Sequence, residues 1–239
     1  MLNFLPLAKY GNVKPHRAEG HNDGWGVAGF LGNTPVVFHK SEKSVLSAEE
    51  IYFYFKTAVR KTISSKSKFT IVHFRKASAG SVKIENTHPF VYNEWIFCHN
   101  GTVLEKDKLV VNKNFCQGET DSELLFNFLL ESIGTRINFI PKLIDSIKYL
   151  KTKVRHTSYT FFLTNNNFFI AYREYSNKFA EDDDSPLWNK DYYTLCYVRT
   201  KSRIIFCSQP ISKTRWMKMK NSELFIVDKN LDIVFNKII

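Results

Sequence analysis

Polar residues that could bind an amino acid and stabilise an acyl oxyanion occur at intervals along the first half of the chain. Arg75 ends a short apolar stretch, and a planar guanidinium there can bind a carboxylate through two parallel hydrogen bonds. Asp121 stands at the start of an expected helix, where its carboxylate could accept hydrogen bonds from an ammonium group. Each residue also has an ordinary explanation: arginines pair with surface acids, and acids favour the positive end of a helix.

Asn100 and Gly101 form a more specific signal. Glycine lets the backbone turn sharply with its amide exposed, and the asparagine places a side-chain NH2 beside that amide. Two donors that converge on one point make an oxyanion hole. The alternative is an ordinary Asn-Gly hairpin turn, which is frequent in β-rich proteins.

Cys98 and His99 precede this turn and suggest a thiol–imidazole dyad. Adjacent residues of a strand point to opposite faces of the sheet, so we reject the dyad and expect Cys98 to be a core thiol. None of the 4 cysteines forms a C-x-x-C pair, so a zinc site is poorly supported. The acidic run 181–184 is interpreted as solvated loop rather than a cation site. We therefore expect no metal and no cofactor.

The elements that must position these residues follow from periodicity and turn signals. Short apolar or β-branched stretches and turn signals predict strands over Trp25–Leu31, Thr34–His39, Phe69–Arg75, Trp95–His99, Tyr159–Leu163, Phe168–Tyr172, Tyr193–Arg199, Arg203–Ser208, Leu224–Val227 and Ile233–Phe235. Helical spacing predicts helices over Ser47–Ile63, Thr120–Ile133 and Phe139–Lys153, with Ser47–Glu50 and Thr120–Glu123 as capping boxes. Strands and helices fall in separate blocks, which favours a layered α+β fold.

Composition narrows the function classes. The 239 residues are 44% hydrophobic, enough for one large domain with a real core. The formal net charge of +11 is spread along the chain, so we interpret it as a lysine-rich surface and expect no nucleic-acid partner. No stretch approaches the ~18 uninterrupted apolar residues of a membrane span, and no signal peptide is evident. We expect a cytoplasmic protein without a membrane partner.

Five phrases in a fixed order make the combination distinctive: His21–Gly26, His73–Arg75, Asn86–Phe90, His99–Gly101 and Gly118–Glu123. In combination they resemble the class II (N-terminal nucleophile) glutamine amidotransferases, particularly the stand-alone branch. Any single phrase is weak, but five ordered matches are specific. Downstream, residues 206–210 resemble the family's late S-E-P strand end, with Gln209 in place of the acid.

The resemblance implies one domain over residues 1–239, folded as a four-layer αββα sandwich of N-terminal-nucleophile hydrolase type. It implies hydrolysis of the side-chain amide of glutamine, or of a γ-glutamyl amide, by an N-terminal cysteine whose own α-amine manages the proton. Ammonia released by such a hydrolase can be passed, in a transferase reaction, to a partner synthetase.

Carried over by motif, Arg75 holds the substrate α-carboxylate and Asp121 the α-ammonium. Asn100 and the Gly101 amide stabilise the tetrahedral oxyanion. His88 is expected to support the loop over the site, although a packing histidine is the simpler interpretation. The turn Asp23–Gly24–Trp25 is a second expected support, with a strand-entry turn as its alternative.

The sequence departs from the family pattern at its N-terminus, where Leu2 stands in place of the nucleophilic cysteine. We expect the domain to lack its first strand, leaving a slot beside Asn100 and Gly101 that is open or filled by Met1–Leu5. The alternative is a catalytically inactive glutamine-binding or regulatory module of the same fold.

Overall fold

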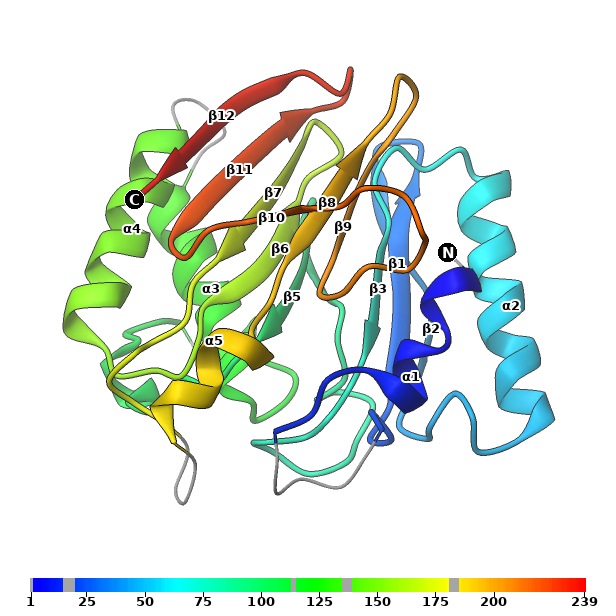
Figure 1. Ribbon diagram of the computed structural model, residues 1–239, viewed down its shortest axis with the longest axis horizontal. Helices are drawn as coiled ribbons and strands as arrows, with labels where there is room; N and C mark the ends of the chain where they lie inside the picture. Colours follow the sequence, from blue (N-terminus) through cyan, green and yellow to red (C-terminus); the bar gives the residue numbers. More distant parts are fainter. Residues whose placement is uncertain (1, 15–19, 113–114, 135–138, 181–184) are drawn as a thin grey trace.

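The computed structural model describes residues 2–14, 20–112, 115–134, 139–180 and 185–239 (Figure 1). The acidic run 181–184, expected to be a solvated loop, lies outside these ranges. The described strands form one six-stranded and two three-stranded sheets. Every strand pairing in them is antiparallel.

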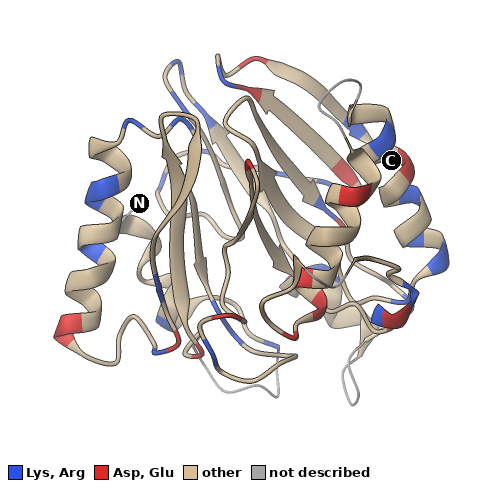
Figure 2. Cartoon of the chain, turned by 180° about the vertical axis from the view of Figure 1, so that it is seen from behind, with Lys and Arg blue, Asp and Glu red and all other residues tan. Residues whose placement is uncertain are grey.

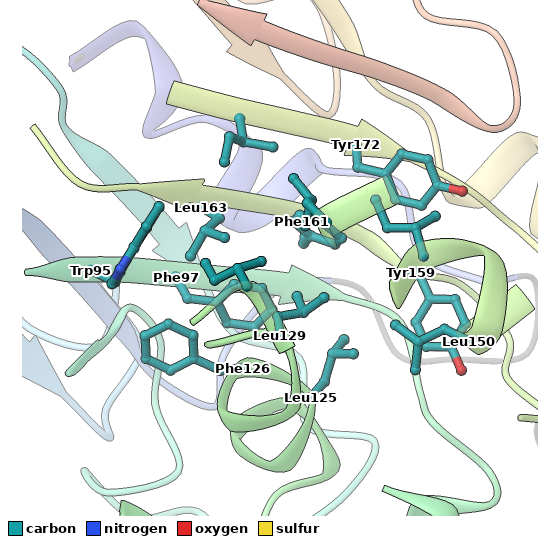
Figure 3. Packing of buried hydrophobic residues seen from close by; sticks show 14 of the residues in the cluster. Trp95, Phe97, Leu125, Phe126, Leu129, Leu150, Tyr159, Phe161, Leu163 and Tyr172 are labelled. Carbon is teal, nitrogen blue, oxygen red and sulfur yellow. The ribbon is translucent and has the colours of Figure 1, made fainter. Parts of the chain in front are cut away.

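The six-stranded sheet has the order β12-β11-β7-β6-β5-β4. Its strands are β4 (Phe90–Tyr92), β5 (Trp95–Asn100), β6 (Thr160–Thr164), β7 (Phe168–Arg173), β11 (Glu223–Asp228) and β12 (Ile233–Ile238). Two helices, α3 (Asp121–Ile133) and α4 (Phe139–Lys153), cover one face of this sheet. Phe97 of β5 stacks on Phe126 of α3 with 5.0 Å between ring centroids, inside an apolar cluster that joins the sheet to both helices (Figure 3).

The other face of the six-stranded sheet carries the alternate side chains, such as Cys98 and Phe162, and packs against both smaller sheets. The first small sheet has the order β2-β1-β3, and the second has the order β10-β8-β9. Their strands are β1 (Trp25–Leu31), β2 (Thr34–Ser41), β3 (Ile71–Phe74), β8 (Cys196–Arg199), β9 (Ile204–Cys207) and β10 (Met217–Lys218). Helix α2 (Glu49–Ser64) packs on the outer face of β1 through Phe55. The layers therefore run helix, sheet, sheet, helices, as in the expected αββα sandwich.

Local signals predicted the start of α3 but not that of α2. The Thr120 hydroxyl caps α3 by accepting from the Glu123 N–H at 3.2 Å. The Glu123 carboxylate instead binds the N–H groups of Gln117 and Gly118, each at 2.8 Å. The predicted Ser47 cap is wrong: the cap residue of α2 is Ala48, without a side-chain hydrogen bond. Ser47 donates to the Ser44 carbonyl at 2.7 Å.

The segment 2–10 is mostly helical rather than extended. It contains η1 (Leu2–Phe4) and α1 (Leu7–Tyr10). Phe4 stacks on Phe74 at the end of β3, with 4.7 Å between ring centroids. Three further short helices were not predicted: η2 (Lys106–Lys108), η4 (Pro186–Trp188) and α5 (Asn189–Tyr192). Lysines and arginines are spread over helices, strands and loops in the view of Figure 2.

Candidate functional site

A cavity of about 460 Å³ lies between β3 and β9. Phe162 and Phe169 of the six-stranded sheet contribute to its wall, and Phe4 and Leu7 of the N-terminal segment also line it. The four residues expected to contact substrate, Arg75, Asn100, Gly101 and Asp121, all line this one cavity. They come from the ends of β3 and β5 and from the start of α3.

The cavity separates two strand edges. β3 pairs with β1 on one side, and β9 pairs with β8. Across the described ranges, no backbone hydrogen bond reaches the other edge of either strand. The η1 helix does not bridge them, because it does not pair as a strand. Unpaired strand edges present N–H and C=O groups that can receive another strand. We call this divided region the slot between β3 and β9.

Arg75 is buried, only 4% exposed, and organises the loop that follows it. Its guanidinium donates to the carbonyls of Ser81 and Ala79, each at 3.1 Å, and to that of Gly80 at 3.4 Å. Burial lowers the pKa of Arg75 from its ordinary value, and the nearby Asp23 carboxylate opposes that shift. The guanidinium has more N–H donors than these bonds use, so it retains capacity for a carboxylate.

Asp23 and Gly24 fix the backbone around Arg75. The Gly24 carbonyl accepts from the Arg75 N–H at 2.8 Å, and the Asp23 N–H donates to the Arg75 carbonyl at 3.0 Å. The Asp23 carboxylate accepts from the Ala77 N–H at 2.8 Å. Gly24 has a φ of 127°, a conformation that residues with a Cβ rarely adopt. Both residues therefore support Arg75 through hydrogen bonds to the backbone of residues 75–77.

Gly101 follows β5 in a turn that has no room for a side chain. A Cβ at this position would overlap the Ser158 carbonyl and approach His99 Nε2 to 2.7 Å. Asn100, the last residue of β5, pairs with Thr160 of β6. The next N–H, that of Thr102, donates to the Thr157 hydroxyl at 2.9 Å. The sheet and the segment at Ser158 thus hold the two expected oxyanion donors in place.

Asp121 is buried at the first turn of α3, also 4% exposed. Its Oδ2 atom accepts from the backbone N–H of Val103 at 2.6 Å. This bond connects the start of α3 to the turn that follows Asn100. The carboxylate therefore has a structural partner and also faces the cavity.

A polar network that was not predicted joins the Arg75 loop to the start of α3. The Glu119 carboxylate accepts from the Ser81 N–H at 3.0 Å and from the Ser81 hydroxyl at 2.7 Å. Asn86 accepts from the Glu119 N–H at 2.9 Å and donates to the Ser81 carbonyl at 3.0 Å. The hydrogen bonds from Ser81 lower the pKa of Glu119 to about 2. Asn86 and Glu119 both lie in phrases of the resemblance, which was the available signal.

The two remaining expected supports occupy different environments. His88 lines the cavity and is buried, and neither of its ring nitrogens has a hydrogen-bond partner within the described residues. Its ring lies 4.5 Å from that of His73, and burial lowers the pKa of His88 well below its ordinary value. Trp25 is fully buried and packs edge-on against Phe55 of α2, away from the cavity lining.

Cys98 and His99 lie on opposite faces of β5, as the strand geometry requires. Cys98 packs between the sheets, and burial raises the pKa of its thiol to about 12. His99 lies on the helix side, where its ring contacts the Ser122 hydroxyl and the Ser158 carbonyl, each at 3.0 Å. A thiol with this pKa does not form the thiolate that attacks an amide near neutral pH.

Comparison with known proteins identifies the family. The family described as "Glutamine amidotransferases class-II" matches residues 7–231. The chain belongs to the class II glutamine amidotransferase family. The match includes all five phrases and the four residues expected to contact substrate.

Two relatives match most of this chain. An uncharacterized protein of Methanocaldococcus jannaschii is 29% identical over 94% of this chain and 66% of its own length. A Haemophilus influenzae protein, whose name assigns it to the glutamine amidotransferases, is 30% identical over 88% of this chain and 74% of its own length. This chain therefore spans about two thirds to three quarters of the length of these two relatives.

Solved structures support the fold. The crystal structure of a Pseudomonas aeruginosa protein, assigned as a glutamine amidotransferase, superposes with a TM-score of 0.57 at 16% identity, covering 93% of this chain and 91% of that one. Glutamine phosphoribosylpyrophosphate amidotransferase from Bacillus subtilis gives 0.57 at 15% identity, over 87% of this class II chain and 42% of that one.

Two further observations concern the described part of the chain. No group of three potential metal-ligating side chains gathers in it. Its helices are all too short or too polar to cross a bilayer.

Proposed function

We propose that this class II domain binds the amino-acid end of glutamine, or of a γ-glutamyl compound, and hydrolyses its side-chain amide. The observation that carries the proposal is the convergence of Arg75, Asn100, Gly101 and Asp121 on one cavity. The remaining donors of Arg75 suit the α-carboxylate, and the Asp121 carboxylate suits the α-ammonium. The Asn100 side-chain NH2 and the Gly101 N–H suit the oxyanion.

The nucleophile in this proposal is the thiol of an N-terminal cysteine on a segment that precedes Met1. A strand carrying it would enter the slot and pair with the free edges of β3 and β9. Its sulfur would attack the amide carbon, and the cysteine's own α-amine would take the thiol proton. Collapse of the tetrahedral oxyanion would release ammonia and leave a thioester, which water would hydrolyse to glutamate. A synthetase that consumes the ammonia is the proposed partner.

The test uses the chain extended by the in-frame codons that precede Met1. Ammonia release from glutamine should appear in the extended protein and should be lost when the leading cysteine is replaced by alanine. An Arg75→Ala variant should lose glutamine binding in calorimetry, because the guanidinium proposed to hold the α-carboxylate is then absent. Arg60→Ala is the matched control, since Arg60 is exposed on α2. An extended protein that binds no glutamine would refute the proposal.

The alternative is a non-catalytic module of the same fold that binds glutamine. The high pKa of Cys98 favours it for the 239-residue chain, because that thiol cannot substitute for the missing nucleophile. Glutamine binding without ammonia release, in the chain both with and without the extension, would support the module over the hydrolase.

A further inference from the structure

The direction of the Arg75 guanidinium is set by the loop that follows it. The guanidinium donates to the carbonyls of Ser81 and Ala79, each at 3.1 Å, and to the Gly80 carbonyl at 3.4 Å. A guanidinium is planar and its N–H groups diverge at fixed angles, so these bonds also determine where its remaining N–H groups point. Whatever holds residues 79–81 in place therefore aims the group proposed to bind the α-carboxylate.

Residues 79–81 are held by Asn86 and Glu119, which come together across 33 positions of sequence. Ser81 donates to Glu119 Oε1 through its N–H at 3.0 Å and through its hydroxyl at 2.7 Å. The Asn86 side-chain NH2 donates to the Ser81 carbonyl at 3.0 Å and to the same Glu119 oxygen at 3.3 Å. We call Ser81, Asn86 and Glu119 the clamp. The Ser81 carbonyl also accepts from Arg75, so one atom joins the clamp to the guanidinium.

The side chains of the clamp have opposite surroundings. Asn86 is fully buried; a Cβ on Gly118 would overlap its Oδ1 atom, and a Cβ on Gly80 would lie 3.1 Å from its Nδ2 atom. Glu119 is exposed, and the hydrogen bonds from Ser81 lower the pKa of its carboxyl to about 2. Because Ser81 is exposed as well, water can replace the lost bonds when Glu119 is changed. Glu119 is therefore the clamp residue that can be altered with least effect on folding.

Glu119 is also tied to the start of α3, where Asp121 lies. The Glu119 N–H donates to Asn86 Oδ1 at 2.9 Å. The next residue, Thr120, caps the helix, and Asp121 is its first residue. The clamp therefore joins the guanidinium proposed for the α-carboxylate to the helix that carries the carboxylate proposed for the α-ammonium. In an α-amino acid both charged groups are attached to one carbon atom, so their separation is fixed.

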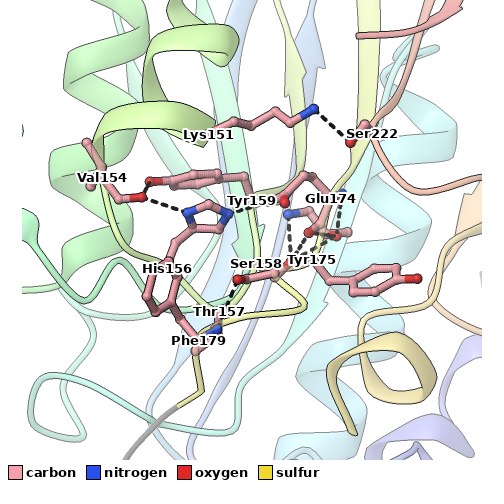
Figure 4. Close-up of polar contacts among 12 residues, drawn as sticks. Lys151, Val154, His156, Thr157, Ser158, Tyr159, Glu174, Tyr175, Phe179 and Ser222 are labelled. Atoms are coloured by element: carbon pink, nitrogen blue, oxygen red, sulfur yellow. Dashed lines mark hydrogen bonds and ion pairs between the residues drawn. The ribbon is translucent and has the colours of Figure 1, made fainter. Parts of the chain in front are cut away.

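The oxyanion turn has a separate support, formed by residues 157–158 (Figure 4). The Ser158 hydroxyl donates to the Glu174 carbonyl at 2.5 Å, and the Ser158 carbonyl lies against Gly101. Among the hydrogen bonds of the described residues, none joins segment 157–158 to the clamp. The clamp therefore acts on the groups that face the two charged ends of the amino acid, and not directly on those that face its side-chain amide.

We propose that Glu119 is a positioning residue: by fixing the Ser81 carbonyl, it aims the Arg75 guanidinium. It thereby sets the separation between Arg75 and Asp121 to that of the two charged groups of an α-amino acid. Glu119 does not touch the ligand and acts through Ser81. The domain thus selects α-amino acids over amino acids whose charged groups lie farther apart. That selectivity rests on the proposed function, whereas the effect of Glu119 on Arg75 does not.

The first test follows the Arg75 guanidinium by NMR in the ligand-free 239-residue chain. Its N–H protons should give separate signals, because the bonds to the loop carbonyls restrict rotation of the group. In Glu119→Ala these signals should merge, and the Ser81 amide should exchange about tenfold faster. Glu119→Gln should restore both, since a glutamine side-chain oxygen still accepts from Ser81. Unchanged Arg75 signals in Glu119→Ala would overturn the inference.

Glu85→Ala is the matched control for both arms of the test. Glu85 is an exposed carboxylate directly before Asn86, and among the described hydrogen bonds it makes none to Ser81. Its removal takes the same charge from the same region without touching the clamp. The variant should keep the native Arg75 signals and the native ligand preference.

The second arm compares two ligands by calorimetry: L-glutamine, and β-homoglutamine, whose carboxylate lies one methylene farther from its ammonium. The native chain should prefer glutamine about 100-fold, and Glu119→Ala should lower that preference about tenfold by weakening glutamine alone. Glu119→Gln should keep it. Equal weakening of both ligands, or an unchanged preference, would overturn the inference. Altered Arg75 signals in a protein that binds neither ligand would sustain the positioning link and refute the proposed function.

Discussion

The carboxylate of Asp121 accepts a hydrogen bond from the backbone N–H of Val103 at 2.6 Å. The residue proposed to hold the substrate ammonium is thus bonded to the turn proposed to hold the oxyanion. Asp121 and Asn100 are separated along the chain, but this bond fixes one relative to the other. The Ser81–Glu119 contact connects the Arg75 loop to the same helix start. The two ends of a bound amino acid would therefore meet parts of one connected network.

An Asp121→Asn variant should separate these two functions of Asp121. Asparagine can still accept from Val103, so the melting temperature should change by less than about 3 °C. Affinity for glutamine should fall about 100-fold, because the ammonium loses a charged partner. Glutaramic acid, which lacks the α-amine, should bind the native and variant proteins equally in calorimetry. Asp145→Asn, at an exposed position on α4, is the control.

A Gly101→Ala variant should be strongly destabilised. The new methyl group would overlap the Ser158 carbonyl and lie 2.7 Å from His99 Nε2. Overpacking of this kind should cost about 3 kcal/mol in urea unfolding. Gly32→Ala is the comparison, because nothing lies within 4 Å of that position. Its φ of +61° alone should cost about 1 kcal/mol. Equal losses in the two variants would contradict the packing described at Gly101.

The buried histidines beside the cavity should make the protein sensitive to acid. Burial lowers the pKa of His73 from 6.5 to about 3, and that of His88 well below 6.5. As the pH falls below about 6.5, the unfolded chain takes up protons that the folded chain does not. Stability should therefore decrease as the pH falls from about 6.5 toward 3, by about 2 kcal/mol per histidine at pH 5.

Histidine-to-glutamine variants supply the measurement for this acid sensitivity. The free energy of unfolding should depend less steeply on pH in His73→Gln and His88→Gln than in the native chain. His39→Gln is the comparison and should change the slope less, because burial also lowers the pKa of His39 but its ring is only partly buried between β2 and α2. A pH slope unchanged in both site variants would show that these imidazoles do not control acid stability.

The cysteines should differ sharply in reactivity. Burial raises the pKa values of Cys98 and Cys196 to about 12, so both remain thiols at pH 8. Cys116 is only partly buried and should be alkylated first by iodoacetamide. Peptide mass spectrometry should find Cys98 modified only after denaturant is added. Rapid labelling of Cys98 in the folded protein would reopen the possibility that it acts as the nucleophile.

Elements with strong local signals were predictable from the sequence. The hairpin β1–β2 has apolar stretches on both sides of the Gly32-Asn33 turn, and the cap of α3 is a local bond from the Glu123 N–H to the Thr120 hydroxyl. The predicted Ser47 cap was wrong because the Ser47 hydroxyl donates to the carbonyl of Ser44 instead of capping α2. Helix α5 was missed because it is short and is bound by Arg173, a partner that a local pattern cannot show.

The candidate site was likewise predictable only where local sequence signals exist. The residues expected to contact substrate were predictable, because each lies in a phrase that resembles the family. Their supports depend on contacts between distant segments, such as those of Asn86 and of Ser81 with Glu119. Trp25 has the residue type of a binding group but packs under α2, because its neighbours on β1 place it on the helix side. Sequence spacing does not reveal which face of a strand becomes core.

The division of one sheet layer between β3 and β9 has a consequence for exchange of amide protons with solvent. The two pieces of that layer are held together through their packing on the six-stranded sheet, with no ladder between them in the described chain. Amides that face the slot should therefore exchange with deuterium through small local openings, while those of β6 and β7 should wait for global unfolding. We therefore expect the part of the described chain that borders the proposed active site to be its least cooperative part.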